Sequence, residues 1–336
     1  MTPEIQQRLF GITHWMDHPM TVWLCGAILA SFVATGATIA GLGKSRRIGE
    51  DDYADALARW KSWAMLAGCI VLPVLLGAAF TIAAVTLLSL VCYRDFARAT
   101  GVFRHYLISI AVVGGIFLAN FAALDHFDRL FFASAPLVVA LIAIITIPQD
   151  RPQGYIQRVA LGCFGFLLFG FSLAYIGNIA NAVAYRPLLL LMFLGVSLND
   201  FTAYFLGRFC GHRKLLVATN GGMTIESFLG AIAFTTLIVA GFGHYVFHQT
   251  PIDNWVSLGL LGFLISVLGQ MGGLVLASVK HDVGLKGIAT NVSSHTGLLD
   301  RFDSLVLVSP AVYHFLSLHL GPLGASEPAR ILTGGG

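Results

Sequence analysis

Long apolar segments recur along the whole chain, and the charged residues fall between them. A membrane-spanning helix needs about 20 predominantly apolar residues, and this pattern repeats from end to end. The predicted spans are residues 20–42, 62–77, 78–93, 106–124, 130–148, 159–180, 187–206, 227–247, 255–278 and 304–320. We therefore expect an all-α polytopic membrane protein with about ten transmembrane helices.

The uncharged run at 62–93 is too long for one span and short for two, so a tight re-entrant pair and two short helices both fit it. In the preceding segment, residues 49–63, acidic residues come first and Arg, Lys and Trp come last. That order suits a helix dipole and an aromatic contact with the headgroup region. We expect residues 49–63 to form an interfacial helix.

The composition agrees with a bilayer as the solvent. Of the 336 residues, 57% are hydrophobic and 11% are charged, whereas a soluble domain carries about 25% charged residues. The net charge of +3 gives no indication of nucleic-acid binding. The five cysteines form no CxxC or Cys/His cluster, so we interpret them as structural. Lys44, Arg46 and Arg47 directly follow a long first apolar run, which predicts a retained anchor rather than a cleaved signal.

The positions of Lys and Arg predict the orientation, because cytoplasmic loops are enriched in them. If the loop 44–61 lies inside, alternation places 94–105, 149–158, 207–226 and 279–303 inside and both termini outside. These five loops contain 16 of the 20 Lys and Arg residues. We therefore expect these loops to face the cytoplasm.

The chain divides into residues 1–158, mainly apolar spans with short polar turns, and residues 159–336, which contain the unusual polar residues. The first polar group is Asn199-Asp200, followed by Tyr204 and Arg208. A carboxylate at the bilayer centre costs about 2.5–3.5 kcal/mol, so Asp200 is expected to have a partner or a function. An ordinary interfacial position one turn outside the hydrocarbon is the alternative.

The second group is the loop from Gly211 to Lys214, followed by residues 219–226, which end in Glu226. Arg213 and Lys214 beside a glycine-containing turn suit a phosphate-bearing ligand or anionic headgroups. Positive loops are also ordinary on this face.

The third group spans residues 280–304. Asp300 and Asp303 are three residues apart and share one face if the segment is helical. Paired carboxylates with lysines and an arginine nearby are what a divalent metal and a polyphosphate need together. A structural ion-pair network, for example Asp282 with Lys286, could use the same residues. Together the three groups predict a cytoplasm-facing polar site in the C-terminal half.

At these residues the chain resembles the phosphatidate cytidylyltransferases, also called CDP-diacylglycerol synthases. The family signature reads approximately S-x-x-K-R, four residues, K-D, a short Gly/Leu/Pro stretch and H-G-G-x-x-D-R-x-D. At the corresponding positions this chain has Ala277, Lys280-His281, Lys286-Gly287, His295-Thr296-Gly297 and Asp300-Arg301-Phe302-Asp303. The upstream family pattern matches Asp200, Gly207-Arg208, the loop 211–214 and residues 220–227. The resemblance covers about residues 195–318.

The resemblance implies a membrane-embedded transfer of a cytidylyl group from CTP to phosphatidate, which gives CDP-diacylglycerol and pyrophosphate. It implies magnesium held by Asp300 and Asp303 with help from Asp200. The implied catalytic residues are Asp300, Asp303, Lys280, Lys286, Arg301 and His295, and the implied substrate-binding residues are Asp200, Arg208, Arg213, Lys214 and Glu226. It also implies CTP, a lipid phosphate and membrane lipids as partners, and the bacterial inner membrane with a cytoplasmic active face.

The departures from the signature keep other functions open. Two acidic family positions are Gly273 and Gly287 here, and the other altered positions are Met223, Ala277, His281, Ser293 and Ser294. A glycine cannot replace a carboxylate as a metal ligand. A catalytically impaired member that binds a lipid or a nucleotide, and a transferase for a different lipid phosphate, are therefore alternatives.

A transporter would also be polytopic, but transporters place ionisable residues near the midplane, often in two related halves. Here the ionisable residues cluster at one interface and in one half. Small residues at Gly114-Gly115 and Gly272-Gly273 allow close helix packing within a protomer or between protomers, so a homodimer stays open.

Overall fold

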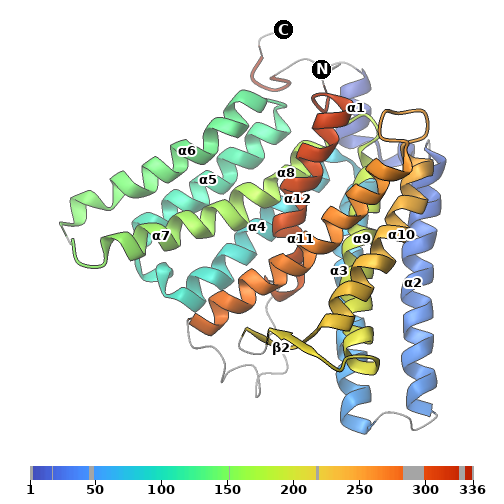
Figure 1. The fold of residues 1–336 in the computed structure, drawn as a ribbon. Helices are drawn as coiled ribbons and strands as arrows, with labels where there is room; N and C mark the ends of the chain where they lie inside the picture. The colour runs from blue at the N-terminus through green and yellow to red at the C-terminus, as the bar shows by residue number, and fades with distance from the viewer. Residues whose placement is uncertain are drawn as a thin grey trace.

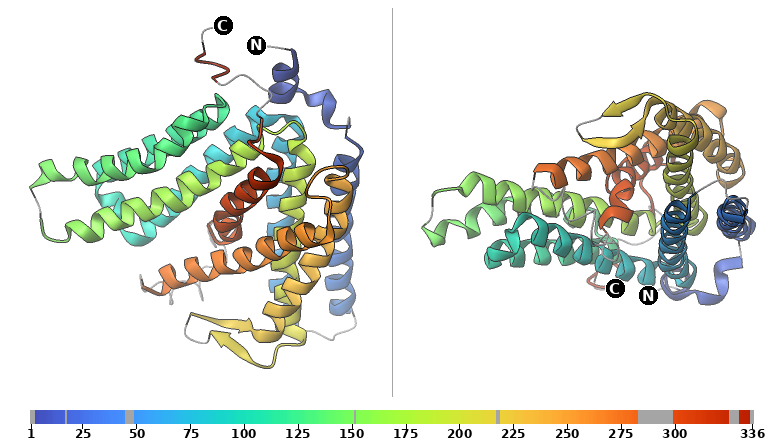
Figure 2. Two further views of the ribbon diagram at one scale, coloured as in Figure 1. Left: turned by 45° about the horizontal axis from the view of Figure 1, so that its top comes forward. Right: turned by 90° about the horizontal axis from the view of Figure 1, so that it is seen from below.

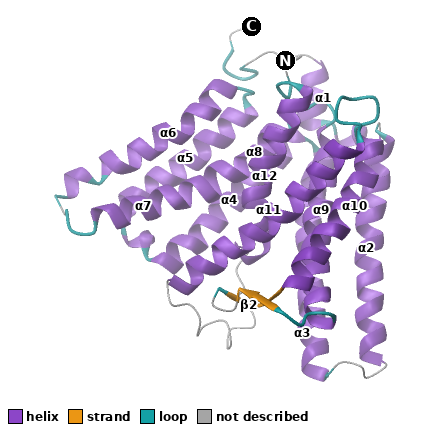
Figure 3. Cartoon of the chain, viewed as in Figure 1, coloured by secondary structure: helices purple, strands orange, loops and turns teal. Residues whose placement is uncertain are grey.

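The structure is a computed structural model, and it describes residues 3–16, 18–44, 49–150, 152–216, 219–282, 299–324 and 330–334. Helices make up most of it (Figures 1 and 3). The α-helices are α1 (Pro3–Phe10), α2 (Pro19–Lys44), α3 (Glu50–Leu76), α4 (Ala78–Thr100), α5 (Tyr106–Leu124), α6 (Asp128–Ile145), α7 (Tyr155–Gly165), α8 (Leu173–Ile179), α9 (Tyr185–Phe209), α10 (Ile225–Val246), α11 (Trp255–Asp282) and α12 (Leu299–Leu320). A π-helix, Phe166–Ser172, joins α7 to α8. Short 3-10 helices lie at Ile12–Met16, Val102–Arg104 and Ile147–Gln149.

The all-α membrane architecture is confirmed. Eight helices within the described ranges are long and apolar enough to cross a membrane, with the α7–α8 segment counting as one. They coincide with eight of the ten predicted spans. The predicted span 62–77 lies in α3, whose apolar stretch Ala67–Leu76 is shorter than a full crossing. The predicted span 304–320 lies in α12, which has 22 residues. The chain is an integral membrane protein.

Helix α3 differs from the sequence expectation. It begins at Glu50 and continues to Leu76, with Gly49 as its N-cap. Residues 50–63 are therefore helical, but they form one continuous helix with the apolar residues that follow rather than a separate helix. No proline or glycine occurs between residues 50 and 67, and nothing in that stretch interrupts the i to i−4 hydrogen bonds.

The uncharged run at 62–93 is resolved into two helices that meet at Gly77. Gly77 has a φ of 150°, which only glycine adopts readily. A Cβ at this position would overlap the backbone carbonyl of Leu9 in α1. The Gly77 N–H donates to the Pro73 carbonyl at 3.1 Å. A single residue therefore turns the chain from α3 into α4.

The helices form two groups. In the first, α10 packs between α9 and α11, α11 packs on α12, and α2 packs on α3 and α9. In the second, α4, α5, α6 and the α7–α8 segment pack together and extend away from α2 and α10 (Figure 2). Both chain ends lie on one side of the molecule, and the hairpin before α10 lies on the opposite side (Figure 1). The candidate site belongs to the first group.

Candidate functional site

The polar centre of the molecule lies where α9, α11 and α12 meet. Asp200 is half-buried on α9, and Asp303 is half-buried in the second turn of α12. The Oγ of Ser304 lies 3.0 Å and 3.2 Å from the two carboxylate oxygens of Asp200. The backbone N–H of Ser304 donates to Asp303 Oδ1 at 2.8 Å, and the Ser304 Oγ lies 3.5 Å from the same oxygen. One buried serine therefore connects carboxylates from two helices.

A second polar network lies next to this centre and links α9, α10 and α11. Asn199 is fully buried, and its Oδ1 accepts from Ser266 Oγ at 2.5 Å and from Gln270 Nε2 at 3.3 Å. Gln270 Nε2 also lies 3.3 Å from the carbonyl of Phe228 in α10. Because buried polar groups need hydrogen-bond partners, this network fixes α9, α10 and α11 relative to one another next to Asp200.

Two glycines let α11 approach α12 closely. A Cβ at Gly272 would overlap the backbone carbonyl of Asp303, and a Cβ at Gly273 would lie 3.3 Å from Asp303 Oδ2. The close packing expected at Gly272-Gly273 is thus made within one chain. Gly273, which the resemblance matches to an acidic family residue ahead of the signature, faces Asp303.

The loop after α9 folds into a short antiparallel hairpin, β1 (Lys214–Leu216) and β2 (Asn220–Thr224). Arg208, Arg213 and Lys214 are exposed there. Glu226 Oε2 accepts from the backbone N–H groups of His212 and Arg213, each at 3.2 Å. Glu226 therefore holds the base of the basic loop.

The other predicted residues are placed only in part. Lys280 is half-buried in the last turn of α11. Asp300 and Arg301 lie in the first turn of α12, as expected for a helical segment, but their side chains are outside the described atoms. Lys286 and His295 lie outside the described residues. Of the predicted set, the structure brings Asp200 and Asp303 together and places Arg208, Arg213, Lys214 and Glu226 on the hairpin side.

The described residues supply few ligands for a metal ion at the candidate site. Among the described residues, no group of three or more His, Cys, Asp or Glu side chains is arranged to hold a metal ion. Asp200 and Asp303 supply two carboxylates around one hydroxyl. Magnesium is typically bound through one or two carboxylates together with substrate phosphates. The residues present fit that kind of site.

The sequence interpretation missed Ser266 and Gln270, and it did not assign a role to Ser304. Ser266 and Gln270 are four residues apart in an apolar span, which places them on one helix face. That spacing was the available signal, but their partner Asn199 lies 67 and 71 residues away along the chain.

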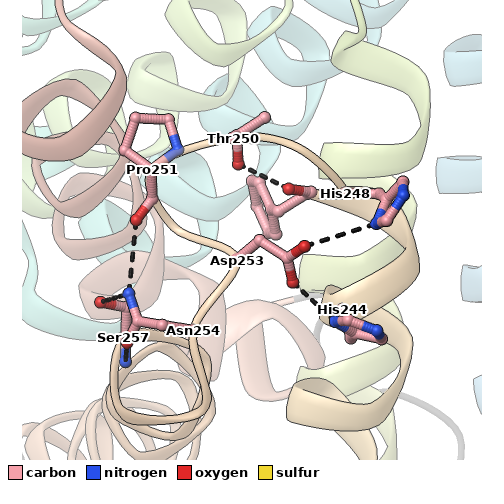
Figure 4. Close-up of polar contacts among 8 residues, drawn as sticks. His244, His248, Thr250, Pro251, Asp253, Asn254 and Ser257 are labelled. Atoms are coloured by element: carbon pink, nitrogen blue, oxygen red, sulfur yellow. Dashed lines mark hydrogen bonds and ion pairs between the residues drawn. The ribbon is translucent and has the colours of Figure 1, made fainter.

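A separate polar cluster lies at the opposite end of α10. His244 Nδ1 donates to Asp253 Oδ1 at 2.6 Å, and His248 Nδ1 lies 3.4 Å from Asp253 Oδ2 (Figure 4). His244 also stacks on Trp255, with ring centroids 5.5 Å apart. The hydrogen bond from His244 lowers the pKa of Asp253. This cluster is about 27 Å along the helix from Glu226, so it lies apart from the candidate site.

Comparison with known proteins gives a consistent family. The profile of the cytidylyltransferase family matches residues 57–319. "Uncharacterized protein YnbB" of Escherichia coli (strain K12) is 28% identical over 194 residues, 56% of this chain and 64% of that protein. A phosphatidate cytidylyltransferase of Bacillus subtilis (strain 168) is 35% identical over 120 residues, 36% of this chain and 44% of that enzyme. A phosphatidate cytidylyltransferase of Staphylococcus epidermidis (strain ATCC 35984) is 29% identical over 240 residues, 60% of this chain and 91% of that enzyme. The aligned part of the chain thus spans less than two thirds of the first two relatives.

Proposed function

The chain belongs to the cytidylyltransferase family, and from this premise we propose that it transfers a cytidylyl group from CTP to phosphatidate. The products are CDP-diacylglycerol and pyrophosphate. Two relatives are named for this activity. The observation that carries the proposal is the pair of carboxylates, Asp200 and Asp303, connected by the Ser304 hydroxyl.

In the proposed reaction a phosphate oxygen of phosphatidate attacks the α-phosphorus of CTP. A new P–O bond forms, the bond from the α-phosphorus to the oxygen of the β-phosphate breaks, and pyrophosphate leaves. Such a transfer depends mainly on positioning and on neutralising charge. Magnesium, held by the aspartates of the site, would offset the negative charge of the phosphate groups.

The residues divide the work by their chemistry. Asp200, Asp303 and Asp300 would hold magnesium, and Ser304 keeps the first two carboxylates in a fixed relation. We assign Lys280, Lys286 and Arg301 to offset phosphate charge, and we keep His295 in the catalytic set on the strength of the resemblance. The three aspartates are thus assigned to the metal, and the three cationic side chains are assigned to the phosphate groups.

Substrate binding is assigned to the hairpin side of the molecule. Arg208, Arg213 and Lys214 are exposed there and suit phosphate groups that arrive from water. Glu226 shapes this loop through its bonds to two backbone N–H groups. Because basic loops face the cytoplasm, we propose that this side is cytoplasmic and that the membrane is the bacterial inner membrane.

One observation favours a second candidate, a member that binds its ligands but turns them over poorly. Gly273 faces Asp303, and the resemblance matches Gly273 to an acidic family residue ahead of the signature. The site thus has one hard oxygen ligand fewer beside Asp303. A lipid- or nucleotide-binding protein, and a transferase for another lipid phosphate, would both keep the remaining carboxylates.

The test is product formation by the purified protein in detergent, with phosphatidate, magnesium and CTP labelled in its α-phosphate. Label in the lipid fraction is expected for the wild type. Asp200→Asn, Asp300→Asn and Asp303→Asn should reduce it to background. Asp128→Asn, on α6 in the other helix group, is the matched control. Undiminished labelling in the three variants would refute their assigned roles, and a folded wild type that makes no product would favour the binding alternative.

A further inference from the structure

A groove of about 810 Å³ lies between α2, α3, α9 and α10 and reaches α12. Its volume is in the range of about 300–1,000 Å³ that is typical of small-molecule sites. The lining is mainly hydrocarbon and aromatic, with residues such as Ile28, Phe32, Val71, Phe201, Ala233 and Leu237. A groove with such walls in a membrane protein suits an apolar chain.

The α2 wall is apolar in effect although it contains three hydroxyl groups. Ser31 donates to the Ile28 carbonyl at 2.7 Å, Thr35 to the Ser31 carbonyl at 2.5 Å and Thr38 to the Ala34 carbonyl at 2.8 Å. Each hydroxyl proton is thus used within its own helix. This wall offers a ligand methyl and methylene surface rather than hydrogen-bond donors.

The groove is continuous with the candidate site. Asp200 is the one charged residue among the described residues that line it, and the same carboxylate accepts from Ser304. Phe302 and Leu305, which flank Asp303 and Ser304 on α12, also line the groove. A ligand in the groove would therefore have its polar end at the two carboxylates and its apolar part between the helices.

We propose that this groove binds a fatty acyl chain of the lipid phosphate substrate and that α2 forms its outer wall. This inference rests on the proposed function, because it names where the hydrocarbon part of that substrate lies. Helix α2 (Pro19–Lys44) precedes the residues 57–319 that match the family profile, so this wall is an addition to the matched region. It places an acyl-chain contact in a part of the chain that the signature residues do not reach.

The experiment uses the 336-residue chain in detergent and a phosphatidate with a photoreactive diazirine in one acyl chain, without CTP. Cross-linked peptides from α2, α9 and α10 are expected. Ala34→Trp fills the groove, whereas Ala37→Trp places the same bulk on the same helix at an exposed position outside the lining. If the Trp side chain displaces about two methylene groups of the acyl chain from the groove, labelling should fall about tenfold in Ala34→Trp. Labelling of Ala37→Trp should equal that of the wild type.

Two further arms separate the outcomes. A diazirine diacylglycerol without the phosphate should label the groove far less than phosphatidate, and equal labelling by both would overturn the assignment to the substrate. Cross-links confined to α5 and α6 in the wild type would overturn the groove itself. Labelled CTP is added to a parallel sample of the same preparation. Groove labelling without turnover would refute the proposed transfer and leave the lipid site standing, whereas turnover with no groove labelling would do the reverse.

Discussion

Replacing Ser304 by alanine tests the contact on which the candidate site depends. Ser304 is 3% exposed, and its Oγ lies 3.0 Å from Asp200 Oδ1, to which the hydroxyl donates its single proton. A hydrogen bond to a charged group contributes about 1.5–3 kcal/mol. If that contact is needed to hold the carboxylates in the transition state, its loss lowers kcat/KM by about tenfold to about a hundredfold.

The assay is the steady-state formation of labelled lipid from CTP at saturating magnesium. Ser309→Ala is the matched control, because Ser309 is also buried on α12 but donates only to the Leu305 carbonyl of its own helix, at 2.6 Å. We expect Ser304→Ala to lose activity and Ser309→Ala to keep most of it, with similar unfolding temperatures. Equal kcat/KM values in the two variants would refute the view that Ser304 organises the carboxylates.

Two other predictions concern stability and are read from thermal unfolding in detergent. Gly272→Ala should destabilise the protein by about 1–3 kcal/mol, because the new Cβ would overlap the Asp303 carbonyl. The control is Gly259→Ala on the same helix, where a Cβ meets no atom within 4 Å, so this change should be neutral or stabilising. Equal changes in unfolding temperature would contradict the close packing of α11 on α12 at Gly272. The pKa of Asp253 is lowered chiefly by the hydrogen bond from His244. The ionised carboxylate therefore stabilises the folded state fully above the ordinary aspartate pKa of about 3.9, and this stabilisation is lost as the pH falls through the lower pKa of the folded state. The difference in unfolding temperature between wild type and Asp253→Asn should therefore be present at about pH 5 and shrink as the pH falls below about 4. A difference that grows between about pH 4 and about pH 2 would contradict this sign.

The membrane architecture was predictable because apolar spans and charged loops separate clearly along the chain. Lys44, Arg94 and Arg158 mark ends of apolar runs, and the helices follow these limits within several residues. The start of α3 was not predictable from hydropathy. A polar helical segment continues into an apolar one there without a helix-breaking residue, and hydropathy reports only the second part.

The candidate site was predictable as a set of residue types but not as a set of contacts. Asp200 and Asp303 stand out because carboxylates are costly in membrane spans. The link between them through Ser304 joins residues 104 positions apart, which neither spacing nor composition encodes. The close approach at Gly272 likewise depends on how α11 crosses α12. The glycine is visible in the sequence, but the atom that it faces is not.

The proposed cytidylyl transfer to a lipid phosphate yields two products, and a single experiment can identify both. Purified protein, CTP, phosphatidate and magnesium are incubated together, the lipid is identified by mass spectrometry, and the released pyrophosphate is counted. We expect CDP-diacylglycerol and pyrophosphate in equal amounts from the wild type and neither product from Asp303→Asn. A folded wild-type protein that binds CTP but forms neither product would contradict the proposed transfer.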